Sequence, residues 1–207
     1  MSKRYGMVID LKRCIGCHYC VVACKMENGI TQGSWARVDT VGGQTMDTAS
    51  GEYLNLIMFY LPRLCMHCRD APCVEVCPTG ACYQREDGIV MVDYDKCVGC
   101  KYCIVACPYG ARYYNKEGSA YFAAERPNEK LGYRPHKLHM TEKCTLCLDR
   151  LESGKEPACV EVCPTGARHF GDLNDPQSEV SQLIARKHAS QLLKDLGTEP
   201  SVYYLSP

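Results

Sequence analysis

Four groups of closely spaced cysteines constrain this chain more than any other feature of its 207 residues. Sixteen of the 17 cysteines fall into these groups, termed the first to fourth tetrads. Their spacings are C-x2-C-x2-C-x3-C, C-x2-C-x4-C-x3-C, C-x2-C-x2-C-x3-C and C-x2-C-x11-C-x3-C. In chain order the members are Cys14, Cys17, Cys20 and Cys24; Cys65, Cys68, Cys73 and Cys77; Cys97, Cys100, Cys103 and Cys107; and Cys144, Cys147, Cys159 and Cys163. An ordinary apolar core does not need so many thiols.

Three chemistries compete for the tetrads. Structural disulfides fit poorly, because the cysteine count is odd and thiols in a C-x2-C pair seldom bridge each other. Zinc can be held by two C-x2-C pairs, but zinc does not explain the third Cys or the Pro that follows three of the tetrads. The run C-x2-C-x2-C-x3-C-P is typical of bacterial ferredoxins, whose fourth Cys serves a second cluster. The third tetrad matches this run fully, so we predict four [4Fe–4S] clusters.

The spacing has a physical reason. Three evenly spaced thiolates let one loop wrap three corners of a cubane, with its N–H groups turned inward. The fourth Cys is expected to start a helix that leads to a neighbouring cluster. Gly16 and Gly99 lie inside two of these loops, where the backbone passes close to inorganic sulfide. The Pro after the fourth Cys suits a turn out of the site.

The net charge of the side chains limits the possible partners, and the negative charge of the clusters must be offset. The side chains balance at 24 basic against 24 acidic residues, which excludes a strongly basic nucleic-acid binder. Each oxidised cluster with its thiolates adds a charge of about −2. Basic residues next to ligands are candidates to offset that charge, with solvated loop positions as the alternative. They are Lys25, Arg69, Lys96, Lys101 and Lys143.

Two internal repeats support double-cluster units. Residues 71–81 recur almost intact at 157–167, and residues 14–24 nearly recur at 97–107. Between the second and third tetrads, residues 81–93 are expected to form a β-hairpin. Other expected strands are 7–10, 53–60, 112–115, 137–140 and 168–170, and short helices are expected at 104–106 and 160–162. A helix is expected at 179–196, followed by an apolar tail at 202–205.

The fold class that follows is α+β, with two bacterial-ferredoxin-like double-cluster modules, inserted loops, a C-terminal helix and an extended tail. Residues 1–64 hold the first motif plus an insertion, and 65–115 form a ferredoxin-like module with the second and third motifs. Residues 116–136 are an insertion loop, 137–171 hold the fourth motif, and 172–207 are a helix and tail that dock on a partner. The cysteine-free segments 27–63 and 116–135 are interpreted as docking surfaces rather than plain surface loops.

Several residues near the tetrads are expected to have lesser roles. His18 and His67 are expected not to be ligands, because thiolates already fill every corner. Cys82, outside the tetrads, is expected to be buried filler. Tyr19 and Tyr102 are expected to pack against clusters. No paired carboxylates, nucleophile elbow, Walker motif or dinucleotide motif occurs, so we predict no catalytic residue and no direct small-molecule substrate.

The four tetrads in this order, with the long gap only in the last, resemble the iron–sulfur subunit of the dimethyl-sulfoxide-reductase family of molybdenum or tungsten oxidoreductases. Residues 171–176 and 196–205 are most similar to the polysulfide, thiosulfate, tetrathionate and arsenate reductase branch. The resemblance implies a non-catalytic electron-transfer subunit. It implies a large catalytic partner carrying a molybdopterin-guanine-dinucleotide metal centre. It also implies a second partner, which is either a membrane anchor that exchanges electrons with quinol or another redox partner such as a soluble cytochrome. The implied substrate is a sulfur or arsenic oxyanion or a related compound.

The resemblance also implies how the tetrads pair, namely the first with the fourth and the second with the third. Spacing alone equally allows the first with the second. The implied ligand sets are site I, Cys14, Cys17, Cys20 and Cys163; site II, Cys24, Cys144, Cys147 and Cys159; site III, Cys65, Cys68, Cys73 and Cys107; and site IV, Cys77, Cys97, Cys100 and Cys103.

Two alternative functions keep the clusters but change their use. One is a relay subunit of a hydrogenase or formate hydrogenlyase-type complex, and the other is a redox-sensing or structural metalloprotein without electron throughput. No apolar run approaches the roughly 20 residues of a membrane span, and no leader precedes the first motif. We therefore expect a position peripheral to the membrane, either outside the cytoplasm through a partner's export signal or in the cytoplasm.

Overall fold

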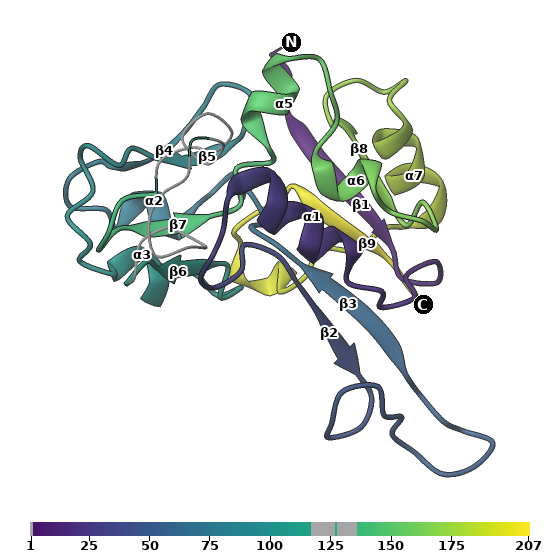
Figure 1. The fold of residues 1–207 in the computed structure, drawn as a ribbon. Helices are drawn as coiled ribbons and strands as arrows, with labels where there is room; N and C mark the ends of the chain where they lie inside the picture. The colour runs from purple at the N-terminus through teal and green to yellow at the C-terminus, as the bar shows by residue number, and fades with distance from the viewer. Residues whose placement is uncertain (1, 117–126, 128–135) are drawn as a thin grey trace.

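A three-stranded sheet joins the two ends of the chain in the computed structural model, which describes residues 2–116, 127 and 136–207 (Figure 1). Strand β1 (Tyr5–Asp10) lies in the middle, antiparallel to β8 (Arg168–Asp172) and parallel to β9 (Val202–Leu205). Helix α7 (Glu179–Lys187) covers this sheet, where Val8 and Val180 are fully buried. Strands expected at 7–10 and 168–170 are confirmed.

This sheet brings the first tetrad beside the fourth. Strand β1 leads into the first tetrad and β8 leads out of the fourth, with Ile9 opposite Arg168. Helix α1 (Tyr19–Asn28), which carries two cysteines of the first tetrad, packs against α6 (Ala158–Glu161) of the fourth. Spacing had left the partner of the first tetrad open, and the topology makes the fourth its neighbour.

The second and third tetrads are joined by a hairpin. Strands β4 (Cys82–Gln84) and β5 (Val90–Val92) pair antiparallel, which confirms the hairpin expected at 81–93. Helix α2 (Pro72–Glu75) packs against α3 (Tyr102–Val105). A further antiparallel strand pair is β6 (Arg112–Tyr114) with β7 (Thr141–Lys143).

A two-stranded arm projects from the body of the molecule (Figure 1). It is formed by β2 (Arg37–Val41) and β3 (Phe59–Arg63), paired antiparallel. The strand expected at 53–60 is therefore largely wrong, because β3 begins only at Phe59. Leu54 has φ 81°, which extended backbone does not tolerate, and the loop between the strands stays irregular.

Three other expectations need correction. The strand expected at 137–140 begins at Thr141, because His139 adopts φ 63° and ends extended backbone there. The helix expected at 179–196 ends at Lys187, where His188 is left-handed, and a short 3-10 helix, η1 (Lys194–Leu196), follows. The third Cys, rather than the fourth, lies at the start of a helix in the first and third tetrads, as at α1 and α3.

The C-terminal tail corrects a further expectation. Residues 202–205 were expected to lie across a partner, but they form β9 in the chain's own sheet. Tyr204 and Leu205 are buried there, and the Tyr204 hydroxyl donates to the Pro62 carbonyl at 2.8 Å. The predicted insertion at 116–136 lies mostly outside the described residues. No helix of the described part has the length and hydropathy that a bilayer crossing requires.

Candidate cluster sites

The same backbone turn recurs in all four cysteine loops. The second residue after the first Cys of each tetrad is left-handed, with φ of 69°, 43°, 66° and 54° at Gly16, His67, Gly99 and Leu146. A Cβ on Gly99 would lie 2.1 Å from the His139 carbonyl oxygen, so that position requires glycine. The turn lets three thiols of one loop face the same side.

A second turn follows three of the tetrads, as expected from their Cys-Pro pairs. Glycines 80, 110 and 166 are left-handed, and each N–H donates to the carbonyl of the last Cys at 3.1–3.3 Å. Two of the last thiols also accept backbone N–H bonds, Cys77 from Cys82 and Cys163 from Ala167, each at 3.3 Å. These bonds lower the pKa of both thiols, although burial opposes them.

Site I encloses a small cavity at the base of the arm. All four of its predicted cysteines line the cavity, together with His18, Val38 and Arg168. The Arg168 side chain is buried, and its Nη2 has no hydrogen-bond partner in the described part of the chain. A donor directed at a cavity lined by four thiols fits a group with sulfide acceptors, such as a [4Fe–4S] cluster.

Site III encloses a matching cavity in the other module. Its four predicted cysteines line the cavity with Tyr109 and Arg112. Burial raises the pKa of Cys68 to about 12, with the charge of Cys65 adding to the effect. Burial would also raise the pKa of Cys65, but the adjacent His67, Lys143 and Arg112 hold it well below its ordinary value.

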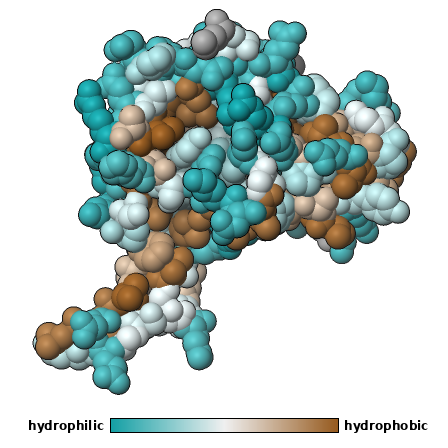
Figure 2. Space-filling view, turned by 180° about the vertical axis from the view of Figure 1, so that it is seen from behind, coloured by the Kyte–Doolittle hydropathy of each residue, from teal (hydrophilic) through white to brown (hydrophobic). Residues whose placement is uncertain are grey.

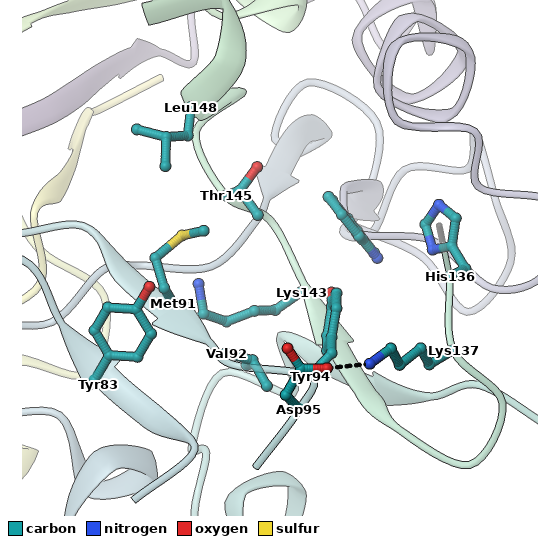
Figure 3. A pocket seen from close by; sticks show the side chains of 11 residues that line it. Tyr83, Met91, Val92, Tyr94, Asp95, His136, Lys137, Lys143, Thr145 and Leu148 are labelled. Atoms are coloured by element: carbon teal, nitrogen blue, oxygen red, sulfur yellow. Dashed lines mark hydrogen bonds and ion pairs between the residues drawn. The ribbon is translucent and has the colours of Figure 1, made fainter. Parts of the chain in front are cut away.

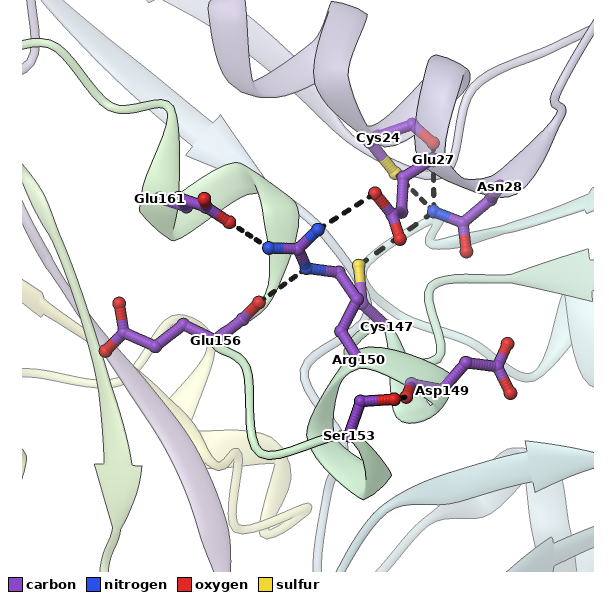
Figure 4. A network of polar contacts seen from close by, with 9 residues as sticks. All are labelled: Cys24, Glu27, Asn28, Cys147, Asp149, Arg150, Ser153, Glu156 and Glu161. Carbon is purple, nitrogen blue, oxygen red and sulfur yellow. Dashed lines mark hydrogen bonds and ion pairs between the residues drawn. The ribbon is translucent and has the colours of Figure 1, made fainter. Parts of the chain in front are cut away.

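Site II lies deep in the first module, between α1 and α5 (Leu148–Glu152) (Figure 4). Burial raises the pKa of Cys24, and its three predicted partners, Cys144, Cys159 and Cys147, raise it further. Because each thiolate repels the others, the set needs a cation to ionise together, and iron supplies one. The Asn28 amide lies 3.8 Å from the Cys24 sulfur and 3.9 Å from the Cys147 sulfur.

Arg150 links the elements around site II. Its guanidinium forms ion pairs with Glu27 of α1, at 3.1 Å, and with Glu161 of α6, and its Nε donates to the Glu156 carbonyl (Figure 4). The contacts tie α1, α5 and α6 together on the surface above the buried thiols.

Site IV has one buried, two half-buried and one exposed cysteine. Cys77 and Cys103 both interact with Cys82, which lies between them. The Cys97 amide is held by the Asp93 carbonyl at 3.1 Å. Cys100 precedes α3 and is exposed.

Exposure separates the four sites into two pairs. Sites I and IV each have one exposed Cys, Cys17 or Cys100, whereas every Cys of site II is buried and site III has only Cys107 partly exposed. Cys144 of site II and Cys65 of site III are electrostatic neighbours across the module boundary. Of the predicted ligand sets, II and III are therefore the more buried, and they lie next to each other.

Most of the buried positive charge near the tetrads comes from residues that the sequence did not single out as candidate cations. Of the five candidate cations only Lys143 is buried, and its ammonium group donates to the Val90 and Cys144 carbonyls. Arg69 and Lys96 instead form surface ion pairs with Glu199 and Asp93. The buried arginines, Arg112 and Arg168, follow the repeated Gly-Ala pair, which was the one available signal.

Among the residues expected to have lesser roles, two are buried and two are exposed. His67 is fully buried beside Cys65, accepts the Val90 N–H at Nδ1 and has a pKa lowered by burial. Cys82 is buried, as expected. Tyr19 and Tyr102 were expected to pack against clusters, but they are 59% and 61% exposed. That expectation is wrong.

A larger pocket of about 360 Å³ lies outside the cysteine sites (Figure 3). Tyr83 and Met91 lie on one side and His136 and Lys137 on the other, and the Lys143 stem extends along it. No cysteine lines this pocket. It therefore belongs to none of the four sites.

Comparisons with family models identify the cofactor class. Residues 56–126 and 127–173 match a family model described as a 4Fe-4S dicluster domain, and residues 13–81 match a second model of the same description. Two dicluster domains are consistent with four [4Fe–4S] clusters. The cofactors expected from the tetrads are thus confirmed.

Several relatives that match nearly the whole chain are named as subunits of reductases. A Halobacterium salinarum protein, provisionally named as the iron-sulfur subunit of a dimethyl sulfoxide reductase, is 49% identical over 98% of this chain and 79% of its own length. A tetrathionate reductase subunit from Salmonella typhimurium is 45% identical over 98% and 72%. The arsenate respiratory reductase iron-sulfur subunit of a Shewanella species is 40% identical over 98% and 96%.

Proposed function

This chain belongs to the iron–sulfur subunits of the dimethyl-sulfoxide-reductase family of molybdenum enzymes, and we propose that it relays electrons through sites I, II, III and IV in that order. The observation that carries the proposal is the burial of the two central sites between two exposed ones. Electron transfer needs partner access only where electrons enter and leave. A sensing or structural metalloprotein has no need of two exposed ends joined by buried sites.

The two ends carry matching apolar surfaces. Around site I, Ile15, Tyr19 and Val22 are 58%, 59% and 57% exposed. The equivalent residues of the repeat around site IV are exposed as well, at 66% for Val98, 61% for Tyr102 and 86% for Val105. Exposed apolar groups of this kind mark protein contacts. We assign one end to the catalytic subunit and the other to a second redox partner.

The arm supports assigning the site I end to the catalytic subunit. Tyr60 of β3 lies against the loop of site I, since a Cβ on Gly16 would be 2.5 Å from its ring. The arm tip exposes Tyr53, Leu54 and Ile57, which are 85%, 83% and 60% exposed (Figure 2). A catalytic subunit is the partner that the names of the relatives imply. We therefore assign the arm and site I to it, and site IV to a membrane anchor or other redox partner.

The double change Leu54→Glu and Ile57→Glu is expected to detach the catalytic subunit. Placing two carboxylates in a desolvated interface lowers affinity by at least roughly 10-fold. The measurement is co-purification through a tag on this chain. Iron content should be unchanged, because the tip lies far from the sites along the arm (Figure 1). Lys3→Glu and Lys194→Glu, at exposed positions on the body, form the matched control, and dissociation in that control would contradict the assignment.

The catalytic partner is assigned a molybdopterin-guanine-dinucleotide centre with Mo or W, and the complex is assigned a sulfur, arsenic or selenium oxyanion or a related sulfur compound. The support is the set of substrates named in tetrathionate, selenate and arsenate reductase relatives. Reduced viologen supplied to the purified complex should be oxidised on addition of at least one such compound. Turnover of only hydrogen or formate would contradict this substrate class.

A further inference from the structure

Two buried arginines occupy equivalent places in the two modules. Arg112 and Arg168 each follow a Cys-Pro-x-Gly-Ala turn and are the first residues of β6 and β8. They are 6% and 4% exposed. Neither forms an ion pair with a carboxylate within the described residues. Their nearby groups that can carry the opposite charge are cysteine sulfurs, as thiolates. A buried arginine cannot shed its charge, and such a charge needs compensation.

Arg168 faces both sites of the first module. Its side chain lines the cavity of site I. Its Nη1 lies 3.7 Å from the sulfur of Cys159, a predicted ligand of site II. It also interacts with Cys20 of site I, and its Nη2 is the buried group without a partner. One guanidinium therefore reaches two predicted ligand sets.

Arg112 repeats this arrangement in the second module. It lines the cavity of site III, and its Nη2 lies 3.0 Å from the Cys73 sulfur. Its interaction with Cys103 reaches site IV. Its Nη1 lies 3.3 Å from the sulfur of Cys82. Burial would lower the pKa of both arginines, but the surrounding thiolates outweigh it and raise both.

We propose that Arg168 and Arg112 each act as a cation shared by the two clusters of one module, raising the reduction potentials of both clusters. The inference rests on the proposed relay and its ligand sets. Reduction adds one negative charge to a cluster, without forming or breaking a bond, and a fixed buried cation favours the state with more negative charge. The electron comes from the neighbouring cluster or partner, which is oxidised by the same amount.

The position of Cys82 explains why the second module holds one buried arginine rather than two. It is the residue that the third copy of the turn places where Arg112 and Arg168 stand in the others, at the first position of β4. Because Cys82 lies in contact with Arg112, a second guanidinium there would face a like charge.

The test is a potentiometric titration of the purified complex, followed by electron paramagnetic resonance. Arg168→Gln should lower the reduced-to-oxidised ratio of two clusters at least tenfold at fixed potential, which is 59 mV for one electron. Arg112→Gln should do the same to the other two clusters only. Arg69→Gln, a change next to Cys68 but 63% exposed and paired with Glu199, is the matched control and should shift none.

Lysine variants separate charge from packing. Arg168→Lys and Arg112→Lys keep the cation and should shift each potential less than the Gln change, with iron content as in the parent complex. If a Gln variant fails to hold iron, the reduction potentials are measured in the corresponding Lys variant instead. A Lys variant that shifts the potentials of all four clusters equally would contradict the proposal. Unshifted potentials in an iron-replete Gln variant would overturn the proposal and leave the relay standing. A parent complex without four clusters would instead overturn the relay.

Discussion

Replacing Cys65 with Ser is expected to lower electron throughput of the complex at least roughly 100-fold, since even outer-shell changes at metal sites cost 10- to 100-fold. Cys65 is buried in site III and adjoins Cys144 of site II, so it stands where electrons cross between modules. Throughput is measured with a donor that enters at the site IV end. A small dye that reduces the catalytic subunit directly should still support turnover.

Cys82→Ser is the matched control for that change. Cys82 is as buried as Cys65 and lies close to Cys77 and Cys103, but it belongs to no tetrad. The control variant should retain its iron and most of its throughput. Equal losses in the two variants would contradict the division between tetrad cysteines and Cys82, and unchanged throughput in Cys65→Ser would contradict the relay.

Replacing Lys143 with Met is expected to destabilise the folded chain by about 1–3 kcal/mol, the range for leaving a buried hydrogen-bond partner unsatisfied. Lys143 is 2% exposed, and its ammonium group donates to the Cys144 carbonyl at 2.8 Å and to the Val90 carbonyl. The change leaves both carbonyls without that donor. It also removes a positive charge that lowers the pKa of Cys65.

Anaerobic denaturant unfolding of the iron-replete chain measures this effect as a shift of the midpoint. Lys101→Met is the matched control, because Lys101 is also adjacent to a tetrad Cys but is exposed over the Tyr114 ring, 4.1 Å from its centre. An exposed cation–π contact is worth about 0.5–1 kcal/mol. If both variants unfolded at the same denaturant concentration, the burial of Lys143 would have no energetic role.

The cysteine loops were predictable because their information is local. The spacing of Cys14, Cys17 and Cys20 determines one loop without reference to the rest of the chain. The hairpin at 81–93 was predictable for the same reason, since a turn and the β-branched run at 89–92 lie together in sequence. Pairing between tetrads was not, because it depends on β1 meeting β8 across most of the chain.

Features set by tertiary contacts were missed or misread. The apolar tail at 202–205 has the composition of either an interface or a core strand, and only its pairing with β1 makes it the latter. Arg112 and Arg168 are ordinary strand residues in sequence, and their position between sulfurs arises when their strands form. Tyr19 and Tyr102 flank ligands in sequence, but the helices on which they lie turn them outward.

The most direct test of the four-cluster relay is the metal content of the complex, purified anaerobically through a tag on this chain. Four clusters require about 16 Fe and 16 acid-labile sulfides per chain, four of each in every cubane. Mo or W should accompany a larger subunit. Nickel in place of Mo or W would move the chain to a hydrogenase-type complex. Zinc in place of iron and sulfide would contradict the assignment of the four tetrads themselves.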